Sequence, residues 1–328
     1  MKITIFASIG AQNLGDELIL KNEIDELRAE YGDDTRFVVM SYDTAHLFFQ
    51  DASVKYSEYF PIDSKKPKNL IRNIGNFFST LWHVATSDIA VIGGGGIFYD
   101  TEIQKGESPL RQWLMRVRMC QLLRTPILFY AVGIDIQKKY NLPKIKAIFK
   151  SSDHILVRDQ HSADTLKQVG IKSEIIPDPV FSDNQKKHPT GKCLKTLSSE
   201  SFDATQIADI DFKGKTVGLA LRRGYIKKEE KQITEMIHII EKAGGKVFLL
   251  PHSFHKMDVL ANDLIFLSQF YKKKHEFTTH LSGAYEAYSQ NKIDMCISMR
   301  YHSMVLSRIY GIDYVAINYA EKTRQLHK

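Results

Sequence analysis

The sequence of 328 residues lacks several features that would assign it to a class at once. No apolar run reaches the roughly 18 residues that a membrane-spanning helix requires. The N-terminal stretch MKITIFASIG is too short an apolar run for a signal peptide and has no cleavage site. The cysteines Cys120, Cys193 and Cys296 are far apart and odd in number, which favours reduced thiols over disulfides. Together these absences predict a cytoplasmic location.

Familiar catalytic and binding motifs are also missing. The chain has no H-E-x-x-H and no paired Cys-x-x-Cys, so no metal site is expected. It has no G-x-S-x-G elbow and no Walker loop, and the turn at residues 8–16 lacks the G-x-G-x-x-G spacing of dinucleotide-binding proteins. Its basic residues are scattered without a DNA- or RNA-binding motif, which argues against nucleic acid as a partner.

What the sequence does contain is the pattern of a globular α/β protein. Hydrophobic residues make up 43% of the chain and charged residues 25%. Short apolar strands alternate with helical segments, which predicts parallel, doubly wound sheets. We expect an N-terminal Rossmann-like domain at 1–181, an interdomain polar segment at 182–215 and a C-terminal Rossmann-like domain at 216–328. Two such domains would face each other across a ligand cleft.

The formal charge of +7 and the isoelectric point near 9.0 indicate the chemistry of the partners. A basic protein favours anionic molecules, such as phosphorylated small molecules and anionic lipid head groups.

One stretch, residues 293–306, combines a buried strand with the start of an apolar helix. Arg300 and His302 lie between the two. Ligands of open α/β sheets bind beyond the carboxyl ends of strands. Arg300 would offer a planar fork to a carboxylate or phosphate, and His302 a group that exchanges protons near neutral pH. The alternative is that Arg300 pairs with a surface carboxylate and that His302 caps the helix.

A second strand end carries four glycines. Residues 88–92 read as a short buried strand, and GGGGIFYD follows at 93–100. Ordering four glycines is entropically unfavourable, so we expect a phosphate or sugar to approach the backbone closely at Gly94 and Gly95. Asp100, just beyond, could act as a base or bind a hydroxyl. Asp16, after the first strand, can cap the next helix or contact a substrate.

Other strand ends supply further polar candidates. Arg158 is a plausible anion ligand, or one half of an ion pair at a helix start. Arg222, His252 and Lys322 each follow a strand of the second half, and the sequence leaves open which of them contacts substrate. Asp178, between two prolines, reads as structural.

These motifs together resemble the polysaccharide pyruvyl transferase family over almost the whole chain. The shared order and spacing of the motifs carry the resemblance, since each motif is short. The matching stretches are Asn13-Leu14-Gly15-Asp16-Glu17, Gly93–Gly95 with Asp100, Val157-Arg158-Asp159, Asp178-Pro179, Ala220-Leu221-Arg222 and Arg300-Tyr301-His302.

The resemblance implies a fold like that of the glycosyltransferase-B enzymes and phosphoenolpyruvate as donor substrate, with no cofactor. The implied reaction forms a ketal on a sugar diol of a cell-surface polysaccharide, or of its lipid-linked precursor, and releases phosphate. His302 would be the general acid and Asp100 the base. Arg300 and Arg158 would bind the donor, helped by Lys322 or Arg222. A glycan acceptor implies a cytoplasmic enzyme, peripheral at the inner membrane face.

The chain departs from the family pattern at three places. The usual G-I-G-P is Gly133-Ile134-Asp135-Ile136, and His252 stands where a glutamine often ends a strand. The chain also stops soon after Lys322, so we expect a short C-terminal part. Two alternatives therefore stay open: a nucleotide-sugar-dependent glycosyltransferase, and a non-catalytic ligand-binding relative.

Overall fold

The computed structural model describes residues 1–45, 47–60, 67–100, 109–152, 154–182, 191–255, 261–320, 323–324 and 326, with the backbone alone at 67–69. These residues divide into two compact units. The first comprises residues 1–10 and 16–182, and the second comprises residues 11–15 and 183–328. Within the described ranges, no helix is both long enough and apolar enough to cross a membrane.

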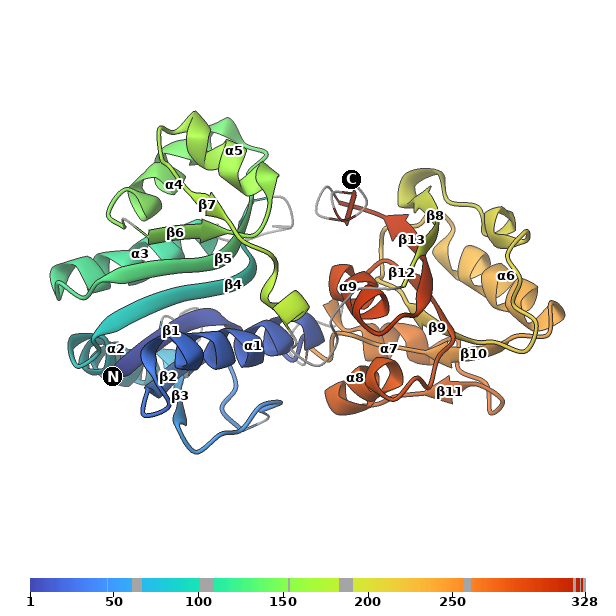
Figure 1. Ribbon diagram of the computed structural model, residues 1–328, viewed down its shortest axis with the longest axis horizontal. Coiled ribbons are helices and arrows are strands. Elements are labelled where there is room, and N and C mark those ends of the chain that lie inside the picture. The colour runs from blue at the N-terminus through green and yellow to red at the C-terminus, as the bar shows by residue number, and fades with distance from the viewer. Residues whose placement is uncertain are drawn as a thin grey trace. The chain divides into compact units, whose positions relative to one another are not determined.

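The first unit is built on a parallel sheet whose seven described strands run in the order β3-β2-β1-β4-β5-β6-β7 (Figure 1). The first six follow the strand order of a Rossmann fold. The strands are β1 (Lys2–Ile9), β2 (Arg36–Ser41), β3 (Val54–Glu58), β4 (Ile89–Tyr99), β5 (Ile127–Asp135), β6 (His154–Val157) and β7 (Glu174–Ile175). The helices are α1 (Leu14–Tyr31), α2 (Pro67–Ala85), α3 (Pro109–Leu122), η1 (Lys139–Asn141), α4 (Leu142–Phe149), α5 (Gln160–Gln168) and η2 (Pro179–Ser182).

Two apolar cores cover the two faces of this sheet, because successive strand residues point to opposite sides. Ile5 of β1 packs in one core with Leu20 and Ile24 of α1. Phe6, the next residue of β1, packs in the other core with residues of α2, α3, α4 and α5. Helix α1 therefore covers one face, and the following helices cover the other.

The second unit repeats this plan. Its six described strands are all parallel, in the order β11-β10-β9-β12-β13-β8, so β9 takes the central place that β1 has in the first unit (Figure 1). The strands are β8 (Cys193–Ser198), β9 (Thr216–Ala220), β10 (Lys246–Leu249), β11 (Glu276–Phe277), β12 (Met295–Ser298) and β13 (Asp313–Asn318). The helices are η3 (Ser199–Ser201), η4 (Ala204–Ile207), α6 (Glu229–Lys242), α7 (Asp263–Ser268), α8 (Leu281–Ser289) and α9 (Tyr301–Ile309).

Successive side chains of β12 again point to opposite faces of the sheet. Met295 and Ile297 join a core with residues of α6 and α7. Cys296, between them, lies on the other side, where its thiol meets Ser303 of α9 at 3.3 Å and the hydroxyl of Tyr288 of α8 at 3.7 Å. The expected α/β fold with two Rossmann-like domains is confirmed.

Two expectations about local structure need correction. Residues 182–215 were expected to be an interdomain polar segment, but β8, η3 and η4 lie there and belong to the second unit. As an edge strand, β8 exposes alternate side chains, so its sequence resembles a loop. The short strand expected at 88–92 is part of β4, which continues through the glycines to Tyr99 and pairs with β5, with an irregular register after Gly95.

Candidate functional site

The strand ends at the centre of the second sheet position the main candidate residues. β9 and β12 are neighbours, and the chain leaves them in opposite directions along the sheet, which makes their carboxyl ends a topological switch point. Arg222 lies just beyond β9, and Arg300 and His302 lie just beyond β12. Arg300 is the N-cap of α9 with an extended backbone (φ −82°, ψ 126°), so strand turns into helix across this residue.

Arg300 is held by a buried carboxylate. Its Nη2 donates a hydrogen bond to Oδ1 of Asp263, the first residue of α7. Oδ2 of Asp263 accepts from the backbone N–H groups of His252 and Ser253, each at 3.1 Å. Burial raises the pKa of Asp263, and the Arg300 guanidinium opposes that shift. Arg300 Nε is buried and has no hydrogen-bond partner among the described residues.

His302 lies against the backbone of the turn at residues 11–15. A Cβ atom added at Gly15 would come within 1.8 Å of His302 Nδ1, so only glycine fits there. The turn is fixed by two backbone hydrogen bonds, from Leu14 N–H to the carbonyl of His252 and from Phe254 N–H to the carbonyl of Gln12, both 2.9 Å. The N-x-G motif therefore positions the imidazole of the R-x-H motif, although almost 300 residues of chain separate them.

His252, which follows β10, is buried, with 1% of its surface exposed. Its Nε2 is 2.9 Å from the hydroxyl of Tyr288, which is 2.7 Å from the hydroxyl of Ser303. Burial first, and then the positive charges of Arg300 and His302, lower the pKa of His252 to about 3. His252 is therefore neutral near pH 7 and does not carry a proton to a ligand.

Arg222 adds a second cation on this side of the sheet. Its Nη1 donates to the hydroxyl of Tyr319 at 3.0 Å. Its guanidinium carbon lies 5.1 Å from the ring centre of Tyr225 and 5.3 Å from that of Tyr319. The two rings orient the guanidinium by cation–π attraction, and its charge also favours the ionised form of Asp263. Lys322, the remaining candidate of this half, lies outside the described residues.

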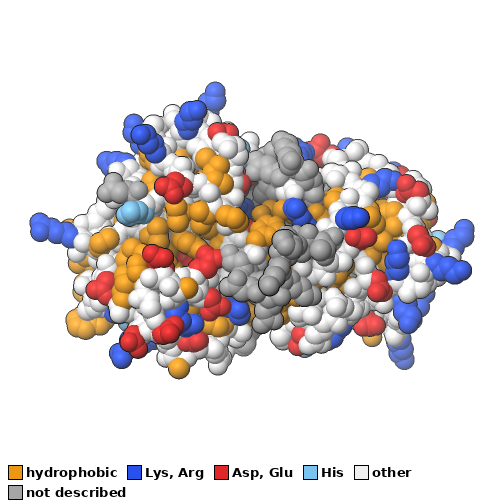
Figure 2. All heavy atoms as spheres, viewed as in Figure 1, with side chains coloured by type: hydrophobic (Ala, Val, Ile, Leu, Met, Phe, Trp, Pro, Cys, Tyr) orange, Lys and Arg blue, Asp and Glu red, His pale blue; other side chains and the backbone are white. Residues whose placement is uncertain are grey.

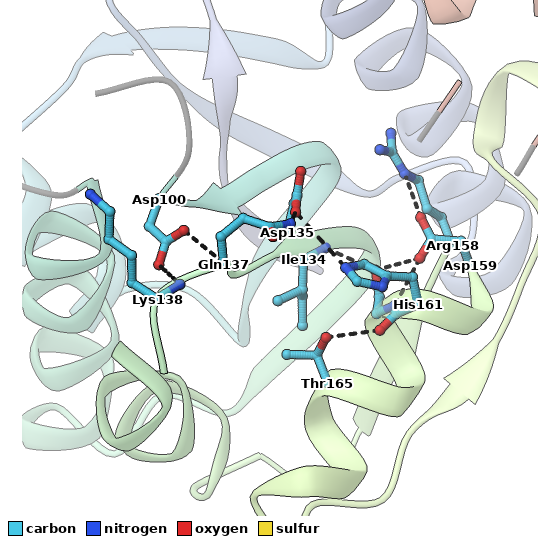
Figure 3. A network of polar contacts seen from close by, with 10 residues as sticks. Asp100, Ile134, Asp135, Gln137, Lys138, Arg158, Asp159, His161 and Thr165 are labelled. Atoms are coloured by element: carbon cyan, nitrogen blue, oxygen red, sulfur yellow. Dashed lines mark hydrogen bonds and ion pairs between the residues drawn. The ribbon is translucent and has the colours of Figure 1, made fainter. Parts of the chain in front are cut away.

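The first unit holds Arg158, which follows β6 (Figure 3). Only 5% of its side chain is exposed, and it forms ion pairs with Asp159 at 3.3 Å and Asp178 at 3.6 Å. Asp159 also caps α5, because its Oδ1 accepts from Ser162 N–H at 2.8 Å. Arg158 further packs on Gly133, where a Cβ atom would come within 2.8 Å of its Nε. The arginine thus has the ion pair at a helix start that the sequence offered as the alternative role.

Asp100 has a set of contacts that the sequence did not predict. Its side chain is buried, and its carboxylate accepts hydrogen bonds from Gln137 N–H at 2.8 Å and from Lys138 N–H at 3.0 Å (Figure 3). Asn141 Nδ2 donates a third hydrogen bond, at 3.0 Å. Three donors on one carboxylate stabilise its charge and fix the loop after β5. This arrangement gives Asp100 a structural role.

The glycine run of β4 faces helix α1. A Cβ atom at Gly93 would come within 1.9 Å of Glu23 Oε1, and one at Gly94 within 1.9 Å of Ile19 Cγ2. At Gly95, whose φ is +86°, a Cβ atom would lie 3.3 Å from Asp16 Oδ1. Close packing between helix and strand thus accounts for glycine at 93 and 94 without a ligand. Substrate contacts at Gly94, Gly95 and Asp16 stay predictions.

Three buried polar residues were not singled out from the sequence. Asp263 anchors Arg300, and the only local signal was the Asn-Asp pair at a helix start. The hydroxyl of Tyr288 forms a hydrogen bond with His252 Nε2. Glu23 packs on Gly93, and neither oxygen of its carboxylate has a hydrogen-bond partner among the described residues. Nothing in the local sequence marks these two, because their partners are remote in the chain.

The described part of the chain contains no group of His, Cys, Asp and Glu side chains that could hold a metal ion.

A model of the polysaccharide pyruvyl transferase family matches residues 13–321. The chain belongs to this family. The suspected resemblance is thereby confirmed, and the protein is a transferase. A comparison with curated protein sequences finds no match.

Solved structures of low sequence identity are similar to this chain over most of its length. UDP-GlcNAc 2-epimerase from Methanocaldococcus jannaschii is 13% identical, with 100% of this chain and 92% of the epimerase chain covered and a TM-score of 0.51. The lipopolysaccharide outer core galactosyltransferase WaaB is 10% identical, with coverage of 98% and 82% and a TM-score of 0.45. The likeness to the epimerase supports the arrangement of two Rossmann-like domains and nothing finer.

Proposed function

We propose that this pyruvyl transferase uses phosphoenolpyruvate as donor and forms a ketal on a sugar diol of a cell-surface polysaccharide or of its lipid-linked precursor. Family membership supports pyruvyl transfer onto a polysaccharide. The observation that carries the donor assignment is the Arg300 guanidinium, which Asp263 holds just beyond the carboxyl end of β12, two residues before His302.

Donor binding requires cations, because phosphoenolpyruvate carries a carboxylate and a phosphate. Arg300 suits this task, since Asp263 fixes the guanidinium plane and a fixed planar fork binds a carboxylate or phosphate bidentately. Arg222, oriented by two tyrosine rings, is our second candidate. Arg158 and Lys322 stay predictions as further donor ligands.

The reaction also requires proton transfers that balance. A proton is added to the methylene carbon of the donor while one sugar hydroxyl attacks the neighbouring carbon and loses its own proton. The second hydroxyl then displaces phosphate from that carbon, and its proton leaves with the phosphate. No cofactor is needed for these steps.

We assign the proton donor to His302. His252 is unsuited to this role, since its pKa of about 3 keeps it unprotonated. For the base, Asp100 and Asp16 are the two candidates. Asp100 is buried and its carboxylate accepts three hydrogen bonds, and Asp16 is half-buried beside Gly95.

Phosphate release tests the proposal. We expect purified protein to release phosphate from phosphoenolpyruvate only when a suitable acceptor from a panel of sugars and lipid-linked sugars is present. His302→Asn should slow release by roughly a hundred- to ten-thousand-fold. His238→Asn, at an exposed position of α6, is the matched control and should be unchanged. Equal rates for the two variants would refute the role of His302.

The donor site has its own test. Arg300→Lys should raise the KM for phosphoenolpyruvate sharply because an ammonium group cannot reproduce the bidentate geometry. Arg36→Lys, on an exposed edge of β2, is the control. Incorporation of label from a nucleotide sugar, with none from phosphoenolpyruvate, would establish the glycosyltransferase alternative. Donor binding without phosphate release across the panel would favour the non-catalytic alternative.

A further inference from the structure

Helix α2 exposes a stripe of large apolar side chains. Leu70, Ile74, Phe78 and Trp82 recur at every fourth residue, with Ile71 beside them, and between 53% and 78% of each residue is exposed. Residues four apart on a helix lie above one another, so these side chains form one continuous face. Figure 2 shows apolar side chains at the lower left margin, where Figure 1 draws α2.

The opposite side of α2 is buried, where Val84 packs in the core of the first unit beside polar side chains. Asn73 and His83 are each 7% exposed, and Thr80 is fully buried. A surface helix of a globular protein normally buries its apolar stripe. The apolar stripe of α2 is instead exposed, so it does not serve the core of the first unit. A contiguous apolar face of this kind marks a surface for a partner.

The charge of the sequence around the stripe has one sign. Residues 64–87 contain no aspartate or glutamate, and they include Lys65, Lys66, Lys68 and Arg72. Arg72 forms an ion pair with Glu58 of β3.

Helix α3, which packs beside α2, also carries basic residues without acidic ones. Arg111 and Arg118 are exposed on it. A second copy of the chain docking on this face would bring two basic rims together. An anionic surface with an apolar interior matches both the charge and the stripe.

We propose that α2 is the surface by which the protein binds an anionic lipid bilayer, lying in the plane of the membrane with Phe78 and Trp82 among the lipid chains. Apolar and aromatic side chains on one face, with basic residues around them, are the features of an interfacial helix. Tryptophan favours this depth because its ring is apolar and its N–H is polar. The inference rests on α2 and its surroundings, and not on the reaction proposed above.

Flotation with lipid vesicles tests the inference, using the purified full chain without substrate. We expect the protein to float with vesicles of equal parts phosphatidylglycerol and phosphatidylcholine, and to bind pure phosphatidylcholine more weakly. Binding should fall as salt is added, because salt screens the attraction of the basic residues to the lipid. The double variant Phe78→Ser/Trp82→Ser should lower the bound fraction by roughly tenfold or more, since it removes two inserted apolar groups.

Tyr140→Ser is the matched control. Tyr140 lies on η1 in the same unit, and its exposure of 70% equals that of Trp82, at 67%, to within a few per cent. The control should float like the parent protein. Both variants change exposed side chains, so their thermal unfolding should match the parent, which separates lost binding from lost folding.

Tryptophan fluorescence gives a second readout, since the chain has two tryptophans. Trp113 is buried with 4% exposure, so a blue shift on adding vesicles would report Trp82. Trp82→Phe should keep flotation and lose the shift. Absence of flotation, equal flotation of the double variant, or a dimer that the double variant dissolves while vesicles do not bind would each overturn the proposal. None of these outcomes depends on phosphoenolpyruvate or an acceptor, so they leave the proposed reaction to its own tests.

Discussion

The two units share the order of five strands, β3-β2-β1-β4-β5 in the first and β11-β10-β9-β12-β13 in the second, yet they bury opposite chemistry where the central strands end. In the first unit, Glu17 and Glu23 of α1 lie buried, and Glu23 packs on the glycines of β4. In the second, His252, Arg300 and His302 gather beyond β10 and β12. The comparison teaches that strand order fixes where a site forms, whereas its chemistry comes from the few side chains placed there. It also predicts that the same kind of substitution, or the same change of pH, alters the free energy of unfolding differently in the two units.

The largest expected effect concerns the buried arginines, one in each unit. Arg158→Met would deprive two carboxylates of an ion pair, that of Asp159 at 3.3 Å and that of Asp178, which is 2% exposed, at 3.6 Å. Arg300→Met would leave Asp263 with two backbone N–H donors. Leaving a buried carboxylate unpaired costs about 3–5 kcal/mol. We expect Arg158→Met at the upper end of that range and Arg300→Met at or below its lower end.

Urea unfolding at neutral pH measures both values. Arg36→Met, at an exposed position, is the control and should change the free energy of unfolding by less than about 0.5 kcal/mol. A larger loss for Arg300→Met than for Arg158→Met would show that the backbone donors around Asp263 do not compensate for the missing guanidinium.

The second prediction concerns acid. The pKa of His252 is lowered by burial from 6.5 to about 3, so the unfolded chain takes up a proton that the folded chain does not. The stabilising contribution is complete above pH 6.5 and is lost as the pH falls from there towards 3. By about pH 5 the loss should reach roughly 2 kcal/mol. His252→Asn should lose less stability than the parent protein between neutral and acid pH, measured by urea unfolding in matched buffers.

The third prediction has the opposite sign and lies in the first unit. Burial raises the pKa of Glu17 from 4.5 to about 7, with a further contribution from the neighbouring charge of Asp16. A raised carboxyl pKa favours the folded state below pH 4.5, and this advantage is lost as the pH rises through 7. Glu17→Gln should therefore stabilise the protein by about 1–2 kcal/mol at mildly alkaline pH and less in acid.

The test of this third prediction is the slope of stability against pH. If Glu17→Gln and the parent protein kept a constant difference from acid to alkaline pH, Glu17 would not titrate with folding. The control is Glu30→Gln, at an exposed position of the same helix, which should leave the slope unchanged.

The smallest effects should come from two helix glycines with opposite surroundings. Nothing lies within 4 Å of a Cβ atom added at Gly75 of α2, so Gly75→Ala should stabilise the protein by about 0.5–1 kcal/mol. At Gly283 of α8 the added Cβ would come within 2.2 Å of Thr278 Oγ1, so Gly283→Ala should destabilise it. Thermal unfolding measures both, and equal shifts of the midpoint would contradict the difference in packing.

Much of the fold follows from local pattern. The buried strands and most helices could be predicted because alternation and helical periodicity are properties of neighbouring residues. β8 could not, since an edge strand exposes half of its side chains and its sequence then resembles a loop. The course of β4 through the glycines was also missed, because its pairing with β5 is a contact between distant segments.

The site divides in the same way. The place of Arg300, His302 and Arg222 at strand ends could be predicted because each closely follows a strand, and their contact with substrate stays a prediction. Asp263 could not, because only the folded chain brings it to Arg300. The hydrogen bonds of Asp100 likewise depend on distant residues, because Gln137 and Lys138 of the loop after β5 and Asn141 of η1 supply the donors. Sequence patterns locate strand ends, but they do not show which buried partners occupy a carboxylate.

The short segment 11–15 shapes how the protein can be divided experimentally. It belongs to the second unit although the chain before and after it belongs to the first. A fragment made of residues 183–328 would therefore lack the strand-like pairing at Ser253 and the glycine surface beneath the His302 ring. Isolating the second unit requires that this N-terminal pentapeptide be supplied, either fused to the fragment or added as a peptide.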